Sequence, residues 1–291
     1  MSVIAIKNLQ VVYIWLDNLK MKLILLVCLA FSCSYTLDAQ RLALSTQSDS
    51  VIYYYYEGWR QVMDEGDYTA SEKMYRKMMN FDPNFLVGLS LLGRITHDLN
   101  ERQYIEQTLE KRKQEVTGNE RLLLDDYIEL VKLTNLREVD PEKAKEQFQI
   151  AFATSERNLK TIVHQYPDEI YYRAEYVEVL QHNYGARKAL DTLYHLLSPK
   201  QQSEPFLLGY AANMEAEDRN FKVALVKADL LATKFKVKQS PKPYVVYGDI
   251  YFKMKKYKKA NKFIQQALKL DPGNIDAQRL EKKIKEVKNF K

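Results

Sequence analysis

Apolar residues recur every three to four positions along most of the chain, which is the period of an α-helix with one buried face. The clearest case is the segment 244–270, where two stripes follow one another. The first stripe consists of Tyr244, Tyr247, Gly248 and Tyr251, and the second of Ala260, Ile264 and Ala267. Residues three and four apart are neighbours on a helix, so the segment predicts two helices that each present one face to a partner.

The same periodicity, broken at Asp-Pro, Ser-Pro and Gly-Asn pairs, predicts a succession of helices along the rest of the chain. They are expected at about residues 52–65, 67–80, 84–98, 101–116, 119–135, 140–165, 168–182, 186–197, 203–217, 219–236, 241–254, 257–270 and 274–290. No stretch alternates with period two for long enough to predict a strand. The low content of 9 Gly and 8 Pro also disfavours a sandwich or barrel, which needs many turns.

The segment 244–272 resembles a tetratricopeptide repeat, a 34-residue helix hairpin with an aromatic, Leu-Gly and Tyr in its first helix and Ala, Phe, Ala and Pro in its second. The positions that match outright are Tyr244, Gly248, Tyr251, Ala260, Ala267 and Pro272. Tyr247 replaces the usual leucine and Ile264 the usual phenylalanine. The resemblance implies an all-α solenoid, a right-handed superhelix of stacked hairpins, and protein binding as its activity.

The small-large-small pattern of the second helix extends the resemblance over about residues 51–274. It is clean at Ala144, Phe148 and Ala151, but poor at Ile105, Leu109 and Arg112. We therefore predict about six hairpins over residues 51–273, with a long second helix near 140–165. Residues 274–291 then form a capping helix that shields the end of the stack. A membrane-surface helix is the alternative for this last segment.

The first forty residues resemble a secretory leader. Met21-Lys22 precedes a short apolar run that extends through Cys28 to Cys33, and Ala39 precedes a plausible cleavage point. We expect translation to start at Met21, residues 1–39 to be removed, and the mature chain to be periplasmic or secreted, with a flexible lead-in over residues 40–50. An uncleaved anchor and lipidation at Cys33 are the alternatives.

Charge is uneven along the chain. The segment 234–291 carries 17 Lys and Arg against 5 Asp and Glu, a net charge of +12, within a whole chain of +6. Such asymmetry marks a surface for acidic partners or anionic lipid, or else a solvated face that aids solubility. Nucleic-acid binding is disfavoured by the expected export.

No pattern predicts catalysis or a cofactor. The only two cysteines lie in the N-terminal apolar run, and the four histidines show no metal-ligand spacing. No phosphate loop and no hydrolase or metalloprotease motif is present. We therefore expect neither metal nor cofactor, and no enzymatic activity; an unrecognised hydrolase would need acid and base groups clustered in one pocket.

The resemblance also implies a binding groove along the first helices of the hairpins. Its register places there Tyr53, Tyr56, Arg60, Arg94, Tyr210, Asn213, Lys242, Asp249 and Phe252. The run of four tyrosines at 53–56 either stacks on a bound peptide or adds packing to the first hairpin. Positions that clamp a peptide's terminal carboxylate in some family members hold Ser90, Arg94, Val245 and Asp249, which disfavours that mode.

The sequence thus predicts a non-enzymatic scaffold that binds a partner polypeptide along a concave face. The alternative is a membrane-associated assembly factor, held by its N-terminal segment, with its basic C-terminal end on anionic lipid or acidic partners. The sequence pattern predicts neither the identity of the partner nor the oligomeric state.

Overall fold

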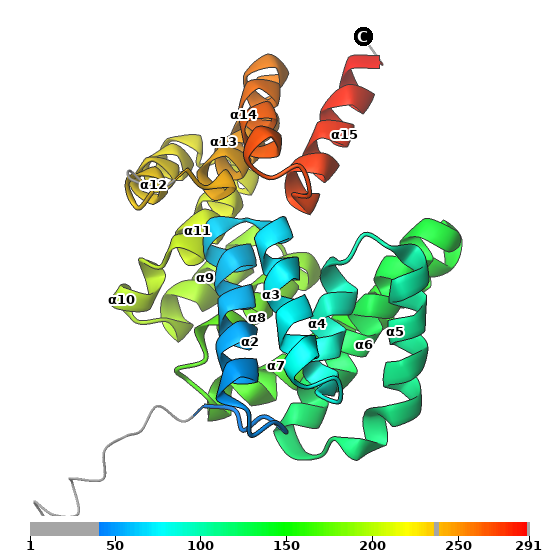
Figure 1. Cartoon of the computed structure of the whole chain (residues 1–291). Helices are drawn as coiled ribbons and strands as arrows, with labels where there is room; N and C mark the ends of the chain where they lie inside the picture. The colour runs from blue at the N-terminus through cyan, green and yellow to red at the C-terminus, as the bar shows by residue number, and fades with distance from the viewer. Residues whose placement is uncertain (1–40, 236–238, 290–291) are drawn as a thin grey trace, which may run out of the picture. The chain divides into compact units, whose positions relative to one another are not determined.

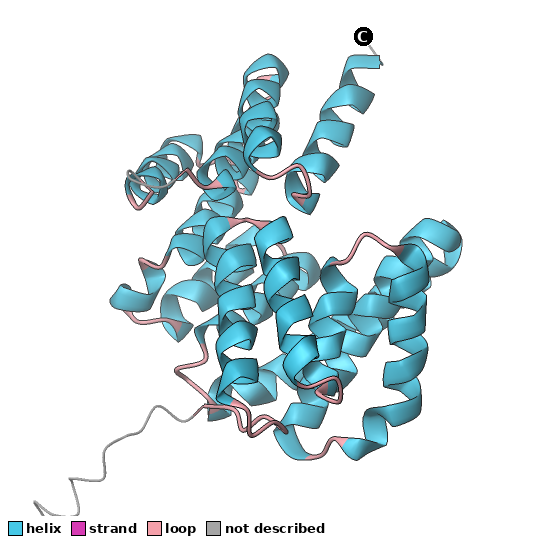
Figure 2. Ribbon diagram, viewed as in Figure 1, coloured by secondary structure: helices cyan, strands magenta, loops and turns pink. Residues whose placement is uncertain are grey.

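The computed structural model describes residues 41–235 and 239–289, and every regular element within these ranges is a helix (Figure 1, Figure 2). The helices are α2 (Asp49–Arg60), η1 (Gln61–Glu65), α3 (Tyr68–Phe81), α4 (Leu86–Ile95), α5 (Leu99–Arg112), η2 (Lys113–Glu115), α6 (Gly118–Val139), α7 (Pro141–Gln165), α8 (Ile170–Tyr184), α9 (Ala186–Leu196), α10 (Pro199–Gln202), α11 (Pro205–Glu217), α12 (Phe221–Thr233), α13 (Pro241–Lys253), α14 (Tyr257–Leu270) and α15 (Ile275–Asn289). The predicted leader, its cleavage point after Ala39 and Cys33 lie outside the described residues.

Successive helices pack as hairpins, and the predicted all-α solenoid is confirmed. The pairs are α2–α3, α4–α5, α6–α7, α8–α9, α11–α12 and α13–α14, followed by α15. First helices also contact one another from hairpin to hairpin, as α4 contacts α6 and α11 contacts α13. The short helix α10 is an addition that the sequence did not predict; Ser198 begins it with a reciprocal cap to Gln201.

Small side chains let the helices of each hairpin approach closely. Ala260, Ile264 and Ala267 on α14 are fully buried, as the stripe predicts. On the facing helix, a Cβ atom added to Gly248 would lie 2.5 Å from Cδ1 of Ile264. Glycine therefore leaves room for Ile264 at this contact, and a larger side chain would force Ile264 to shift.

The second hairpin forms although its apolar pattern is poor. Arg102 on α5 is buried, and its guanidinium donates to Oδ1 of Asn135 at 3.1 Å and to the carbonyl of Thr96 at 2.9 Å. An arginine whose donors are satisfied can occupy a buried helix face, so polar contacts replace part of the expected apolar stripe. Both α6 and the predicted long α7 exceed an ordinary repeat helix, which accounts for the irregular repeat spacing.

Helix α2, the first helix of the first hairpin, packs across first helices of later hairpins. The hydroxyls of Tyr55 on α2 and Tyr172 on α8 lie 2.6 Å apart in the core. The ring of Trp59 stacks on Tyr171 of α8, with ring centroids 5.9 Å apart, and also contacts Tyr127 of α6. The tyrosine-rich helix α2 therefore covers part of the surface that the resemblance assigns to a bound peptide.

The predicted flexible lead-in is anchored from residue 41 onward. The backbone N–H of Leu42 donates to Glu169 at 3.2 Å, and Ser45 donates to Glu120 through both its N–H and its hydroxyl. Leu42 and Thr46 are buried. The polar composition of residues 45–50 is typical of a flexible segment, but carboxylates at the starts of α6 and α8 bind its polar groups.

A set of hydrogen bonds joins the first hairpin to the end of the last one. The buried carboxylate of Asp271 accepts from the N–H of Tyr68 at 2.8 Å and from the hydroxyl of Thr69 at 2.6 Å. Ser240 donates to the carbonyl of Glu65, and Asn274 donates to that of Gly66. We call these contacts the clasp. A carboxylate at the N-terminus of α3 also interacts favourably with the helix dipole.

Replacing Asp by Ala is expected to lower the stability of the protein more at Asp271, which belongs to the clasp, than at Asp82. Asp271→Ala removes the acceptor for two N-terminal groups of α3 and leaves two partly buried donors unpaired, so we expect a loss of about 1–3 kcal/mol of stability. Asp82→Ala, at the corresponding Asp-Pro of the first hairpin, removes one exposed bond to the N–H of Asn84 and serves as the control. Thermal and urea unfolding measure both; equal losses would contradict the role of the clasp.

Candidate functional site

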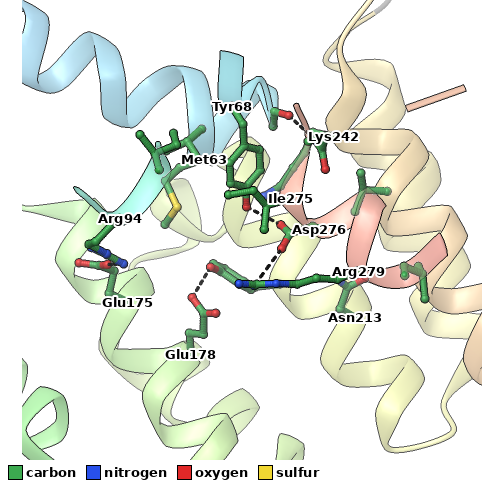
Figure 3. A pocket seen from close by; sticks show the side chains of 18 of the residues that line it. Met63, Tyr68, Arg94, Glu175, Glu178, Asn213, Lys242, Ile275, Asp276 and Arg279 are labelled. Atoms are coloured by element: carbon green, nitrogen blue, oxygen red, sulfur yellow. Dashed lines mark hydrogen bonds and ion pairs between the residues drawn. The ribbon is translucent and has the colours of Figure 1, made fainter. Parts of the chain in front are cut away.

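The first helices of the hairpins enclose a cavity of about 680 Å³. Its wall is formed by side chains of α2, η1, α4, α6 and α8 together with α11, α13 and α15, so residues far apart in the sequence face one another (Figure 3). The wall exposes polar and apolar surface in nearly equal shares, with Leu91, Leu130, Leu133 and Val245 among its apolar residues. A concave surface that combines apolar side chains with polar groups is typical of a binding site.

Five of the nine residues that the sequence assigned to a groove line this cavity. They are Arg94, Tyr210, Asn213, Lys242 and Asp249. They come from three different first helices, α4, α11 and α13, so the predicted helical register of these hairpins places the residues on the cavity side.

The other four predicted residues lie outside the cavity. Tyr53 is 62% exposed, and Tyr56 donates its hydroxyl to Glu169 at 2.8 Å. Arg60 pairs with Glu57 and Glu65 within its own hairpin, while Phe252 packs against Tyr257 in the last repeat. For Tyr56 the cause is the docking of α2 on α8, which engages the tyrosine within the protein instead of leaving it on an open groove.

An ion pair forms one wall of the cavity. The guanidinium of Arg94 lies 2.7 Å from the carboxylate of Glu175 and 4.5 Å from the centre of the Tyr127 ring. Tyr127 also donates its hydroxyl to Glu175 at 2.7 Å. Burial opposes the charge on Arg94, but Glu175 keeps the pKa of Arg94 above its ordinary value. Arg94 therefore remains charged, and its contact with Glu175 orients it along the wall.

Lys242 lies on the opposite wall, beside the clasp (Figure 3). Its ammonium nitrogen is 5.5 Å from the centre of the Tyr210 ring. Burial lowers the pKa of Lys242, and the carboxylates of Asp276, Asp64 and Glu178 oppose that change. Each of these carboxylates accepts a tyrosine hydroxyl: from Tyr68, Tyr171 and Tyr210 respectively. Gly209 leaves room for the lysine, since an added Cβ would lie 3.3 Å from its Cε.

Several cavity residues were not predicted to lie there. Arg137 on α6 and Asp276, Arg279 and Lys283 on α15 all line it. The sequence shows the three α15 residues only as charges on the outer side of a capping helix, at spacing i, i+3 and i+7. Only the tertiary structure, in which that side faces α6 across the cavity, reveals their position.

In the described ranges no group of histidine, cysteine, aspartate and glutamate side chains is arranged to hold a metal ion. Across the same residues, no helix is both long and apolar enough to cross a membrane.

The fold defines a protein built from repeated helix hairpins. A comparison with family models identifies one of these hairpins as a member of a known repeat family. Residues 241–274, which comprise α13 and α14, match the tetratricopeptide repeat model. Those residues are therefore a tetratricopeptide repeat, as the sequence predicts. Among solved structures, a tetratricopeptide repeat protein from Parabacteroides merdae ATCC 43184 aligns over 81% of this chain and 99% of its own, with 14% identity and a TM-score of 0.42. A search of curated proteins finds no match.

A buried carboxylate behind the Arg94–Glu175 pair makes stability depend on pH. Asp126 accepts a hydrogen bond from Ser155 through one oxygen, while its other oxygen is buried without a hydrogen-bond partner in the described ranges. Burial raises the pKa of Asp126 to about 7, and the neighbouring Glu175 adds to the rise. The ordinary pKa of an aspartate is about 3.9. As the pH rises from about 4 to about 7, the unfolded chain loses this proton first, so the free energy of unfolding decreases.

We therefore expect Asp126→Asn to stabilise the protein by about 1–3 kcal/mol at pH 8 and by less at pH 5, because the amide keeps the acceptor for Ser155 without a buried charge. Denaturant unfolding at the two pH values measures the difference. Asp125→Asn, at the more exposed neighbouring position, is the control and should show no such pH-dependent gain. A gain of equal size at both pH values would contradict the assignment.

Proposed function

We propose that this protein is a non-enzymatic scaffold that binds a segment of a partner polypeptide in the cavity between the first helices. The observation that carries the proposal is an unsatisfied acceptor at the cavity wall. Oδ1 of Asn213 on α11 is buried and has no hydrogen-bond partner within the described structure. A buried acceptor without a donor is costly. A change of side-chain rotamer at Asn213 on binding would bring this oxygen to the cavity, where a backbone N–H of a bound segment would satisfy it.

Other residues that line the cavity also support the binding of a partner segment there. Nη1 of Arg94 is likewise buried and unpartnered among the described residues, and it lies on a helix that borders the cavity from another side. Apolar side chains such as Leu91 and Leu130 also line the cavity, and its volume of about 680 Å³ suits a few side chains of an extended segment. Tetratricopeptide repeats generally mediate protein–protein interactions, which favours a polypeptide as the occupant.

Binding rather than catalysis is supported by the state of the carboxylates in the cavity. Glu175 is held by Arg94 and Tyr127, Glu178 by Tyr210, and Asp249 by Lys253 at 2.6 Å. A general acid or base must be within reach of a substrate proton, whereas these groups are engaged with side chains of the protein. They serve to orient the cations and tyrosines around them.

Photo-crosslinking in the native cell tests the cavity directly. The photoreactive residue p-benzoylphenylalanine replaces Asn213 in one full-length variant and Tyr53 in the other. We expect a partner adduct from position 213 and little or none from the exposed position 53, because only the former faces the cavity. Adducts from position 53 alone would contradict the proposal and restore the tyrosine run as the binding surface.

Export remains part of the proposal, since the apolar run before Ala39 resembles a secretory leader and the residues after it fold as the scaffold. We expect the intact mass of the protein purified from its native cell to correspond to a chain that begins at Gln40. A lipidated chain that begins at Cys33, or a chain that retains residue 21 onward, would instead favour the membrane-associated alternative. The measurement is electrospray mass spectrometry of the undigested protein.

A further inference from the structure

Three cations at the cavity mouth lack a carboxylate within hydrogen-bonding distance among the described residues. They are Arg137 at the C-terminal end of α6 and Arg279 and Lys283 on α15. The nearest carboxylate contact of Arg279 is Asp276, at 4.0 Å. Arg137 lies over the ring face of Phe148, 6.0 Å from its centre. We refer to Arg137, Arg279 and Lys283 as the cationic mouth.

The carboxylates on the lining, by contrast, are engaged inside the protein. Glu175 and Asp249 form ion pairs with Arg94 and Lys253, at 2.7 and 2.6 Å. Glu178 and Asp276 accept tyrosine hydroxyls, at 2.6 and 2.8 Å. The carboxylates of the cavity are therefore occupied, while the cationic mouth leaves a positive potential that a ligand of opposite charge would neutralise.

Arg137 and Arg279 line the same cavity, and both carry a positive charge. Partial desolvation of the exposed Arg137 lowers its pKa, and the neighbouring Arg279 lowers it further by repulsion. Two guanidinium groups near each other without an intervening anion are unfavourable, and a carboxylate between them would turn the repulsion into two charge-assisted hydrogen bonds. The apolar side chains of Leu133 and Leu280 line the cavity next to these cations.

We propose that the bound segment is acidic: an Asp or Glu carboxylate sits between Arg137 and the α15 cations, and an adjacent apolar side chain enters the cavity. The inference rests on the proposed function and specifies the chemistry of the partner. The recognising groups come from the middle of the chain and from the capping helix, so the segment bridges α6 and α15. A polypeptide is favoured over a nucleic acid because the carboxylates of Glu175, Glu178 and Asp249 in the lining would repel phosphates, and the ring of Tyr210 is already covered by Lys242.

Selection from a phage-displayed library of random short peptides, against the full-length mature protein, tests the proposal without a known partner. We expect the selected peptides to be enriched in Asp or Glu next to an apolar residue. Synthetic copies are then measured by fluorescence anisotropy against Arg137→Glu/Arg279→Glu, for which we expect affinity to fall about tenfold or more. Peptides in which Lys replaces the acidic residue should regain affinity for this variant.

A matched control makes the same change in charge elsewhere. Lys258→Glu/Lys262→Glu alters two exposed lysines on α14 that do not line the cavity, and we expect affinity to stay within about twofold of wild type. Circular dichroism melting confirms that both double variants are folded. Because both carry the same net charge, any difference between them reports position rather than overall charge.

The outcomes separate the two proposals. Peptides that bind but show no acidic preference, or that lose affinity equally in both double variants, would overturn the acidic segment and leave the scaffold function intact. The absence of any selected peptide would overturn the scaffold function itself. Labelled oligothymidylate that competes as strongly as the acidic peptides would show that the mouth binds nucleic-acid phosphates instead.

Discussion

The carboxylate of Asp271 is the contact on which the cavity depends. A stack of helix hairpins needs no bond between its first and last members, since each hairpin contacts only its neighbours. Here the Asp-Pro that ends the last repeat also caps helix α3 of the first hairpin, and Tyr68 lies 203 residues earlier in the sequence. This contact keeps the first hairpin beside α13 and α15, and it thereby makes one cavity from helices at both ends of the chain.

Tyrosine hydroxyls supply the second level of organisation. At least eight tyrosines of the described chain donate to carboxylates on other helices or segments, among them Tyr56, Tyr68, Tyr127, Tyr171 and Tyr210. A tyrosine buries a large apolar ring and still satisfies a partly buried carboxylate, so one residue type contributes both packing and polar pairing. The content of 21 tyrosines thus reflects internal connections more than an open binding surface.

The pairing of tyrosines with carboxylates explains why cations of the cavity are left without a carboxylate partner. Tyrosines and two cations satisfy the carboxylates on its lining, and the cations at the mouth have no carboxylate within hydrogen-bonding distance among the described residues. The consequence is a site whose unfilled interactions are charged donors at the mouth and an amide acceptor deeper in the wall. A scaffold with such a site would select its partner by two interactions: the charged groups at the mouth would bind an acidic side chain, and the amide in the wall would accept a hydrogen bond from the partner's backbone.

The sequence by itself determined the long helices, their pairing and the repeat at 241–274, because these depend on spacings of three to seven residues, whereas it did not predict the short helix α10. Local spacing alone predicts the close contacts of Gly248, Ala260, Ile264 and Ala267. The register of the first helices predicts which residues face the cavity, namely Arg94, Tyr210, Asn213, Lys242 and Asp249. The tertiary structure alone decided that α2 covers part of the groove, that the lead-in is anchored and that Arg279 and Arg137 line one cavity. Those contacts join residues far apart in the sequence, such as Leu42 and Glu169, which are 127 positions apart. No local pattern records which exposed faces of a helical stack meet when its two ends come together.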